Sequence, residues 1–431
     1  MGARATGAWY WRGWNGSSVE RPGPGRARLA AAGGSSPNPV AGSVILRGAG
    51  ERRIRGGHLW VYAGEIERVA GAVAPGGIVD VTDGRGRFLG RGYYNPASTI
   101  AVRLLTRERA EEVDEGLLRR RIAAAVARRR RIYAPGESCR LVFGEGDWLP
   151  GLVVDGFGDC LVLQLGTLGM ERWRDAIVSI LCETLAPRGI YERSDVPTRV
   201  HEGLEPRSGV LYGEVPEPIE IALDGLRFLT SLRGGQKTGM YLDHRLNRRA
   251  LAPHSPGRQV LDVFCNSGSF ALYALQAGAA AATGIEISPE CLELARCNAR
   301  LNGLVERCRW IEGNAFDQLR ELDRAGQRFG LIVLDPPAFT KSSRATAAAR
   351  RGYKEINLRA LRLAEAGGIV FTATCSYHMS AEEFLDVLRD AAADAGRAVT
   401  LVELRGQAPD HPVNLCVPET RYLKCAVLQV H

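Results

Sequence analysis

Apolar residues in the C-terminal half of the chain gather into short runs that alternate with amphipathic stretches. The runs QVLDVF, ATGIEI, LIVLD and GGIVFTAT have the length of strands and are bounded by turn residues. Between them stand helical patterns such as SFALYALQAG, PECLELARCNARLNG and YKEINLRALRLAEAG. Strands that alternate with helices predict an α/β fold with a doubly wound, mostly parallel sheet. Ligands of such sheets bind at the carboxyl ends of the strands.

The pattern before this region predicts further domains. Short strands and Gly-rich turns, as in GGIVDVTDGRGRFLGRGYYN, predict a small β-barrel over residues 43–112. A basic amphipathic helix over 107–133, a hairpin in LPGLVVDGFGDCLVLQLGTL and a further helix predict a central α+β domain over 113–228. The α/β domain then covers residues 229–431. Residues 1–42 are rich in Gly, Pro, Ser, Ala and Arg without periodicity, and we expect a disordered extension there.

Composition narrows the class of protein. The net charge of +8 favours an anionic partner, nucleic acid above all. No apolar stretch is long and charge-free enough to span a bilayer, so we expect no membrane partner. The ten cysteines form no C-x-x-C pair, which predicts reduced thiols in the cytoplasm and no metal site.

A tight turn between a strand and a helix is the first candidate for ligand binding. The strand ends at Phe264, the turn runs through Cys265, Asn266, Ser267 and Gly268, and the helix starts near Ser269. Such a turn brings backbone N–H groups and a helix N-terminus up to a ligand. A dinucleotide-dependent oxidoreductase is the rival interpretation, but the G-x-G-x-x-G pattern is missing, so nothing here is shaped for a pyrophosphate.

Polar residues that follow the next two strands complete a nucleoside pocket. Glu286 ends ATGIEI, where a carboxylate accepts hydrogen bonds from ribose hydroxyls. Asn314 and Ala315 follow WIEG, where an amide meets an adenine ring. In this order the motifs fit an S-adenosylmethionine (SAM) pocket. The residues predicted to line it are Phe264, Cys265, Asn266, Ser267, Gly268, Glu286, Ile287, Asn314, Ala315 and Asp335.

The stretch LDPPAF adds a carboxylate beside the predicted methyl donor. Asp335 follows an apolar strand directly, and Pro336 and Pro337 give a rigid turn without N–H groups. The Asp335 carboxylate can hold a flipped base by its ring nitrogen and amino edge, while the Pro336 carbonyl accepts from the amine.

Taken in order, these motifs resemble those of the ribosomal RNA cytosine-5 methyltransferases with an N-terminal PUA domain. The matching segments run from about residue 43 to the end: GRFLGRGYYNP, LPGLVVDGFGD, GGQKTGMYLDHR, LDVFCNSGSFA, LDPPAF, RRGYKEINLRAL, TCS, PDHPV and PETRYLKCAVLQV. The chain departs from related members at two places, with Asn266-Ser267-Gly268-Ser269 for Tyr-Thr-Gly-Gly and Asn314 for Asp. A carboxylate at position 314 would hold the adenine amino group more strongly.

The resemblance implies a PUA domain, a central RNA-binding domain and a class I Rossmann-like methyltransferase domain. It also implies large-subunit ribosomal RNA as partner, a homodimer, and SAM contacts at Gln236, Lys237, Thr238, Tyr241 and Asp243. From the residues alone, that last segment predicts only a loop with a helix cap.

Methylation of cytosine at carbon-5 needs a cysteine beside an acid at the cofactor-facing edge of the sheet. Asp335 and Cys375 each end a predicted strand, and they converge if those strands are neighbours. Cys265 lies in the cofactor turn, where a small side chain suits packing, so Cys375 is the predicted nucleophile. The residues expected to contact the substrate are Pro336, Pro337, Lys341, Tyr353 and Asn357, although for the last three a helix start with a solvated face is an equal alternative.

Two other classes of protein stay open on the sequence. An RNA guanine N-methyltransferase would use Asp335-Pro336-Pro337 without a nucleophile. A non-catalytic RNA-binding factor would keep the fold, but its cofactor and catalytic motifs would have no reason to be intact.

Overall fold

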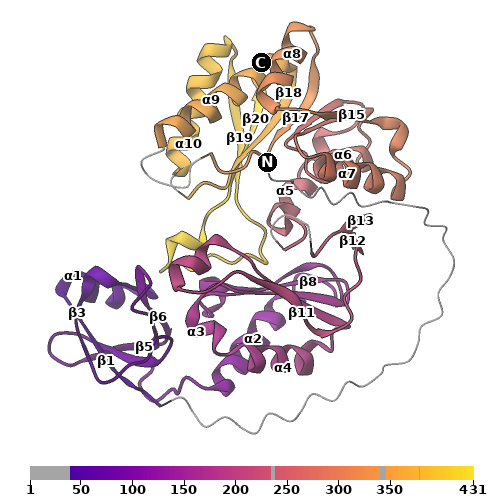
Figure 1. The fold of residues 1–431 in the computed structure, drawn as a ribbon. Helices are drawn as coiled ribbons and strands as arrows, with labels where there is room; N and C mark the ends of the chain where they lie inside the picture. Colours follow the sequence, from indigo (N-terminus) through magenta and orange to yellow (C-terminus); the bar gives the residue numbers. More distant parts are fainter. Residues whose placement is uncertain (1–38, 234–237, 340–345, 378) are drawn as a thin grey trace, which may run out of the picture. The chain divides into compact units, whose positions relative to one another are not determined.

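A computed structural model describes residues 39–431 apart from 234–237, 340–345 and 378. The expected N-terminal extension therefore lies almost wholly outside the described residues, as do Gln236, Lys237 and Lys341. The described strands form four sheets (Figure 1). The division of the chain at residues 112 and 228 stays a prediction, although the sheets follow one another along the chain in that order.

The first sheet has six strands in the order β2-β6-β5-β4-β1-β3. Its strands are antiparallel neighbours except for β1 and β4, which pair in parallel. A short helix, α1 (Gly48–Arg55), follows the first strand. The strands are β1 (Gly42–Leu46), β2 (Trp60–Tyr62), β3 (Ile66–Ala70), β4 (Ile78–Thr82), β5 (Phe88–Tyr94) and β6 (Ile100–Thr106).

The basic helix of the central region is shorter than the sequence predicts. Helix α2 runs over Glu115–Arg130, not 107–133, because the Asp114 side chain accepts a hydrogen bond from Leu117 N at 2.8 Å and caps its start. A five-stranded sheet in the order β11-β10-β9-β8-β7 follows. Its elements are β7 (Cys139–Phe143), β8 (Leu152–Phe157), β9 (Cys160–Leu165), α3 (Leu168–Glu171), α4 (Arg174–Leu185), β10 (Gly189–Ser194) and β11 (Arg207–Gly213). The predicted hairpin is confirmed as β8 and β9.

A two-stranded hairpin, β12 (Ile219–Leu223) and β13 (Leu226–Thr230), leads to the seven-stranded sheet. The order is β16-β15-β14-β17-β18-β20-β19, with only β20 antiparallel to its neighbours. Its strands are β14 (Gln259–Val263), β15 (Ala281–Glu286), β16 (Cys308–Glu312), β17 (Phe329–Leu334), β18 (Ala364–Thr374), β19 (Val399–Arg405) and β20 (Lys424–Val430). The predicted α/β fold with a mostly parallel sheet is confirmed.

Helices cover both faces of this sheet, as Figure 1 shows. Alternate residues of the central strands explain the two layers: Val260 and Leu331 belong to one apolar cluster, Leu261 and Ile332 to the other. The helices are α5 (Arg245–Arg249), α6 (Ser269–Gln276), α7 (Pro289–Leu301), α8 (Ala315–Arg324), α9 (Thr346–Leu363) and α10 (Ala381–Ala395). None of the helices in the described part of the chain has the length and apolar character that a membrane crossing requires.

The strand order places a ligand site between β14 and β17. From β14 the chain proceeds to β15 and β16 on one side, and then returns to β17 on the other side. In open α/β sheets the crevice at such a reversal, outside the carboxyl ends of the strands, is where ligands bind. The residues that follow β14 and β17 are Phe264 and Asp335, which belong to the two motifs that the sequence singled out.

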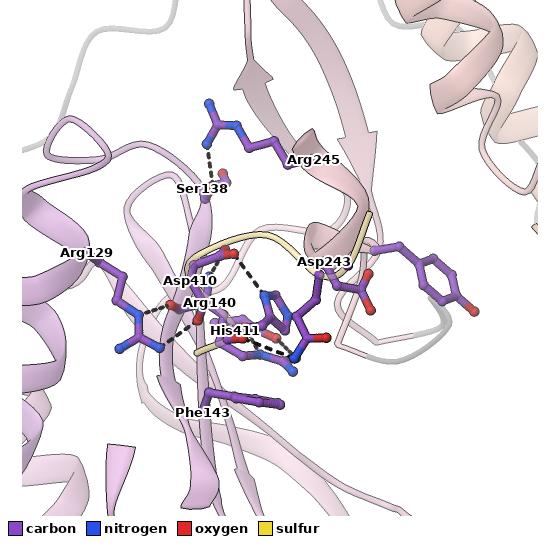
Figure 2. A network of polar contacts seen from close by, with 12 residues as sticks. Arg129, Ser138, Arg140, Phe143, Asp243, Arg245, Asp410 and His411 are labelled. Carbon is purple, nitrogen blue, oxygen red and sulfur yellow. Dashed lines mark hydrogen bonds and ion pairs between the residues drawn. The ribbon is translucent and has the colours of Figure 1, made fainter. Parts of the chain in front are cut away.

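A buried polar network ties the central sheet to the loop that precedes β20. The Asp410 carboxylate accepts from the backbone N of Arg140 at 2.9 Å and lies 2.9 Å from His411 Nδ1 (Figure 2). Arg129 donates to the backbone carbonyl of Asp410 at 2.6 Å, and the His411 ring packs on Phe143. The histidine of PDHPV is therefore structural, as a lone turn histidine usually is.

Replacing Asp410 by alanine is expected to reduce the free energy of unfolding by about 2–4 kcal/mol, because buried donors of Arg140 and His411 lose their acceptor. Urea unfolding followed by circular dichroism measures this. Asp386, whose ion pair with Arg389 is exposed on α10, is the matched control, and its alanine variant should change stability by less than about 0.5 kcal/mol. Equal effects of the two variants would contradict a structural role for the network.

Candidate active site

Asp335 and Cys375 lie at the same edge of the sheet because their strands are parallel neighbours. Strand β17 pairs with β18 with Leu334 opposite Thr372, and each side chain of interest follows its strand directly. Both side chains act on the hydroxyl of Tyr241. Burial raises the pKa of Tyr241 above its usual range, and the nearby Asp335 and Cys375 raise this pKa further. The condition that the sequence left open, that the two strands are neighbours, is confirmed.

The loop that carries Cys375 is held from both sides. Thr374 Oγ1 donates to the Tyr353 hydroxyl at 2.8 Å and accepts from Ser376 N at 3.1 Å. Lys424, the first residue of β20, donates from Nζ to the carbonyls of Ser376 at 2.8 Å and Tyr422 at 3.1 Å. These bonds fix the backbone around a half-buried thiol.

Lys424 places a buried amine next to that thiol. Burial lowers the pKa of Lys424, whereas its interaction with Cys375 raises it. Because such an interaction is mutual, the ammonium form of Lys424 favours the thiolate form of Cys375. The sequence reasoning missed Lys424, since it lies 49 positions after the cysteine and only the antiparallel pairing of Thr374 with Lys424 brings them together.

The Asp335 carboxylate lies between the two strand ends and a buried histidine. Its Oδ1 atom is 3.2 Å from Nε2 of His244, and 24% of its side chain is exposed. The backbone N of Asp335 donates to Val263 O of β14 at 3.4 Å. Pro336 is buried and Pro337 is exposed, so the turn leaves the sheet at this point.

The turn after β14 has the backbone that a close ligand approach requires. Phe264 and Asn266 both have positive φ angles, 64° and 49°. Gly268 also has a positive φ, of 76°, and a Cβ there would lie 2.5 Å from the Trp310 ring. The turn therefore needs glycine at this position and holds the start of α6 against the β15–β16 side of the sheet.

Glu286 connects this turn with the next one. Its Oε2 accepts from Asn266 N at 3.0 Å, and its Oε1 accepts from Ile287 N at 2.8 Å and Ser288 N at 3.1 Å. Carboxylate oxygens have further acceptor capacity beyond these bonds. One carboxylate therefore orders both loops and still offers acceptors to ribose hydroxyls.

The other predicted cofactor residues take different positions around this edge. The Asn314 side chain caps α8 by accepting from Phe316 N at 2.9 Å, which leaves its NH2 group for an adenine. Ala315 is buried, whereas Ile287 is 65% exposed. Ser267 is buried and donates from its backbone N to Asn266 Oδ1. Burial raises the pKa of Cys265 well above its usual value, in agreement with a packing role.

Thr238 and Asp243, which frame the segment that leads into α5, are both buried. Thr238 Oγ1 donates to Asp155 of β8 at 2.6 Å, and Arg140 holds that carboxylate with two bonds of 2.8 Å. The Tyr422 hydroxyl donates to Asp243 Oδ2 at 2.6 Å. Asp155, which the sequence analysis did not single out, thus anchors the predicted cofactor segment to the central sheet.

Two of the residues expected to contact RNA are fully buried. Tyr353 and Asn357 on α9 have no exposed surface, and Tyr353 packs on Phe339 and Phe384. Contact of these side chains with RNA stays a prediction that their burial does not support. The structure gives Tyr353 a role in shaping the Cys375 loop instead.

The residues present fit a nucleoside cofactor. Three successive loops, after β14, β15 and β16, lie on adjacent strands and present a left-handed turn, a carboxylate and an amide. Such an edge, on a sheet with this strand order, defines a class I Rossmann-like, SAM-dependent methyltransferase. Among the described residues, no group of His, Cys, Asp and Glu side chains is arranged to hold a metal ion.

Comparison with known proteins supports the assignment to the SAM-dependent methyltransferases. Residues 202–419 match the family model described as S-adenosylmethionine-dependent methyltransferase, and residues 44–107 match the PUA-like domain. Ribosomal RNA large subunit methyltransferase I of Shewanella denitrificans is 41% identical over 392 residues, which cover 90% of this chain and 99% of that protein. The protein of the same name from Aeromonas hydrophila is 40% identical over 90% of this chain and 100% of its own length. The chain belongs to the ribosomal RNA large subunit methyltransferase I family.

The fold has also been seen in crystals. SMU.776, solved in complex with SAH, superimposes with a TM-score of 0.79 at 20% identity, covering 90% of this chain and 99% of that one. A SAM-dependent methyltransferase from Streptococcus mutans gives a TM-score of 0.78 at 20% identity over the same shares. Both share the fold of this chain over 90% of its length.

Glu286→Gln is expected to raise the Kd for SAM by about tenfold or more, because an amide replaces a charge-assisted acceptor and turns a donor toward backbone N–H groups. Isothermal titration calorimetry measures the affinity. Glu290→Gln, a change on the exposed first turn of α7, is the control and should bind as the wild type does. Unchanged affinity of the Glu286 variant would remove this carboxylate from the cofactor site.

Proposed function

We propose that the protein methylates carbon-5 of a cytosine in large-subunit ribosomal RNA through a covalent bond to Cys375. The observation that carries this proposal is the position of the Cys375 thiol and the Asp335 carboxylate on adjacent strand ends of a methyltransferase sheet. The names of the relatives and the PUA-like region support ribosomal RNA as the substrate. By the family resemblance, the proposal includes a homodimer that works in the cytoplasm.

Carbon-5 of cytosine is a poor nucleophile, and Cys375 would change that. When its thiolate forms a bond to carbon-6, the ring electrons shift to carbon-5, which becomes the electron-rich end of an enamine. When bound, S-adenosylmethionine supplies an electrophilic methyl group. After methylation a base removes the carbon-5 proton, the sulfur–carbon bond breaks, and the aromatic ring and the thiolate are restored.

Asp335 would hold the base in place for this attack. The target base must leave its stack, which costs a few kcal/mol unless it is already unpaired. At the ring-nitrogen and amino edge of the base, the Asp335 carboxylate then accepts one N–H of the amino group, and the Pro336 carbonyl accepts the other. A base held there lies beside the Cys375 loop, because β17 and β18 end side by side.

Lys424 would increase the thiolate fraction of Cys375. Its amine is bonded to the carbonyls of Ser376 and Tyr422, which holds it at the cysteine loop at a fixed position. A buried positive charge next to a thiol increases the fraction that is thiolate at neutral pH.

Cys375→Ala is expected to abolish formation of 5-methylcytidine, measured by nucleoside mass spectrometry of RNA from a strain that expresses only the variant. SAM affinity should stay within about threefold of the wild type, because the side chain is not part of the cofactor loops. Full methylation by the variant would sink the covalent mechanism. In that case, a methylated guanine in the product would favour a guanine N-methyltransferase.

A strain without the gene gives the complementary result. Its large-subunit RNA should lack one 5-methylcytidine that returns with the wild-type gene and not with Cys375→Ala. If no methylated nucleoside is lost, or if the lost one is not 5-methylcytidine, the proposed reaction is wrong.

Lys424→Met is expected to lower kcat by about tenfold or more at neutral pH, because an opposite charge near a thiol favours its ionised form. The loss should shrink as the pH rises, since the thiol then ionises without help, so the acidic limb of the pH–rate profile moves to higher pH. Lys354→Met, at a half-buried lysine of α9 that is paired with Asp394, should leave the profile unmoved. A loss that is equal at every pH would show that Lys424 only supports the loop.

A further inference from the structure

A buried histidine lies against the Asp335 carboxylate, and none of the sequence motifs had assigned it a role. His244 Nε2 is 3.2 Å from Asp335 Oδ1. His244 is 3% exposed, and its ring meets the Phe270 ring edge-on, with ring centroids 5.4 Å apart. Asp335 keeps part of its side chain exposed, so the histidine reaches the carboxylate from its buried side.

The contact made by Nδ1, the second ring nitrogen of His244, indicates which nitrogen carries the proton. The Nδ2 atom of Asn247 lies 3.1 Å from His244 Nδ1. A side-chain amide NH2 group only donates, so Nδ1 must accept. In the neutral ring the proton is then on Nε2, which is the nitrogen that faces Asp335.

The orientation of the Asn247 amide is fixed in turn. Arg405, the last residue of β19, donates from Nε to Asn247 Oδ1 at 3.1 Å. Asn247 Nδ2 donates to Gly406 O at 3.3 Å. A rotated amide would set its NH2 against the guanidinium and its oxygen against a carbonyl, which is two unfavourable contacts in place of two bonds.

We propose that His244 is a positioning residue that donates from Nε2–H to Asp335 Oδ1 and aims the other carboxylate oxygen at the target base. This proposal rests on the proposed function, because it assigns Asp335 to the substrate. A carboxylate bonded through one oxygen no longer rotates freely, so Oδ2 points in one direction before the base arrives. The chain of donors runs from Arg405 through Asn247 and His244 to Asp335, and it links the edge strand β19 with the active site.

Two substitutions of His244 separate positioning from packing. His244→Leu removes the donor and should lower kcat by about 10- to 100-fold, the range for a misplaced reacting group. His244→Gln keeps an N–H donor at similar reach and should keep kcat within about threefold of the wild type, with SAM affinity near the wild-type value in both variants. A glutamine variant as slow as the leucine variant, with both folded by circular dichroism, would overturn the proposal.

Nuclear magnetic resonance of the wild-type protein labelled with ¹⁵N-histidine tests the same proposal without any activity. The His244 signals are those lost in His244→Gln, and they should show a bare Nδ1 and a protonated Nε2 at neutral pH. A proton on Nδ1 would overturn the proposal even where the leucine variant fails to fold. A product other than 5-methylcytidine would instead refute the proposed function, since the tautomer and the comparison of variants do not depend on which base is methylated.

Discussion

Strand β17 pairs in parallel with β14 on one side and with β18 on the other, and this pairing determines where Asp335 lies relative to the turn after β14 and to the Cys375 loop. Leu334 is opposite Val263 in one ladder and opposite Thr372 in the other. Neighbouring strands are about 4.8 Å apart, so Asp335 must emerge between the cofactor turn and the Cys375 loop. The spacing of Asp335 and Cys375 thus comes from sheet geometry, which is stiff, and the loops only refine it.

Buried polar contacts then connect this edge to segments that are far away in the sequence. Asp155 of the central sheet holds Thr238, Tyr422 holds Asp243, and Asp410 holds Arg140 and His411 (Figure 2). Each of these carboxylates is buried and would be costly without its partners. The central sheet therefore takes part in holding this edge: its Asp155 accepts from Thr238 at the start of the segment 238–243, and its Arg140 donates to Asp410.

Local patterns in the sequence predict the sheet and the two strand-end residues, because apolar runs between turns define strands and the residue after a strand lies at its carboxyl end. The same local reasoning cannot find His244, Lys424 or Asp155. Their contacts with Asp335, Ser376 and Thr238 span 48 to 91 positions and form only in the folded sheet. Helix periodicity was available for α9, where Tyr353, Ile356 and Ala360 share one face, and it indicates burial of Tyr353 rather than RNA contact. The strand β18 starts at Ala364, inside a stretch that reads as helix, since pairing with Phe329 outweighs the helical propensity of that stretch.

On the proposed mechanism, a carboxylate and a thiolate stand on adjacent strand ends, where their like charges repel each other. Each has a nitrogen from a different element beside it: His244 Nε2 lies 3.2 Å from Asp335 Oδ1, and the amine of Lys424 is bonded to the Cys375 loop. On the two proposals, the imidazole N–H aims the carboxylate, whereas the amine supplies the positive charge that favours a thiolate. His244 immediately precedes α5, and Lys424 is the first residue of β20. Because the two side chains come from separate elements, the proposal assigns the orientation of the base to one and the reactivity of the thiol to the other.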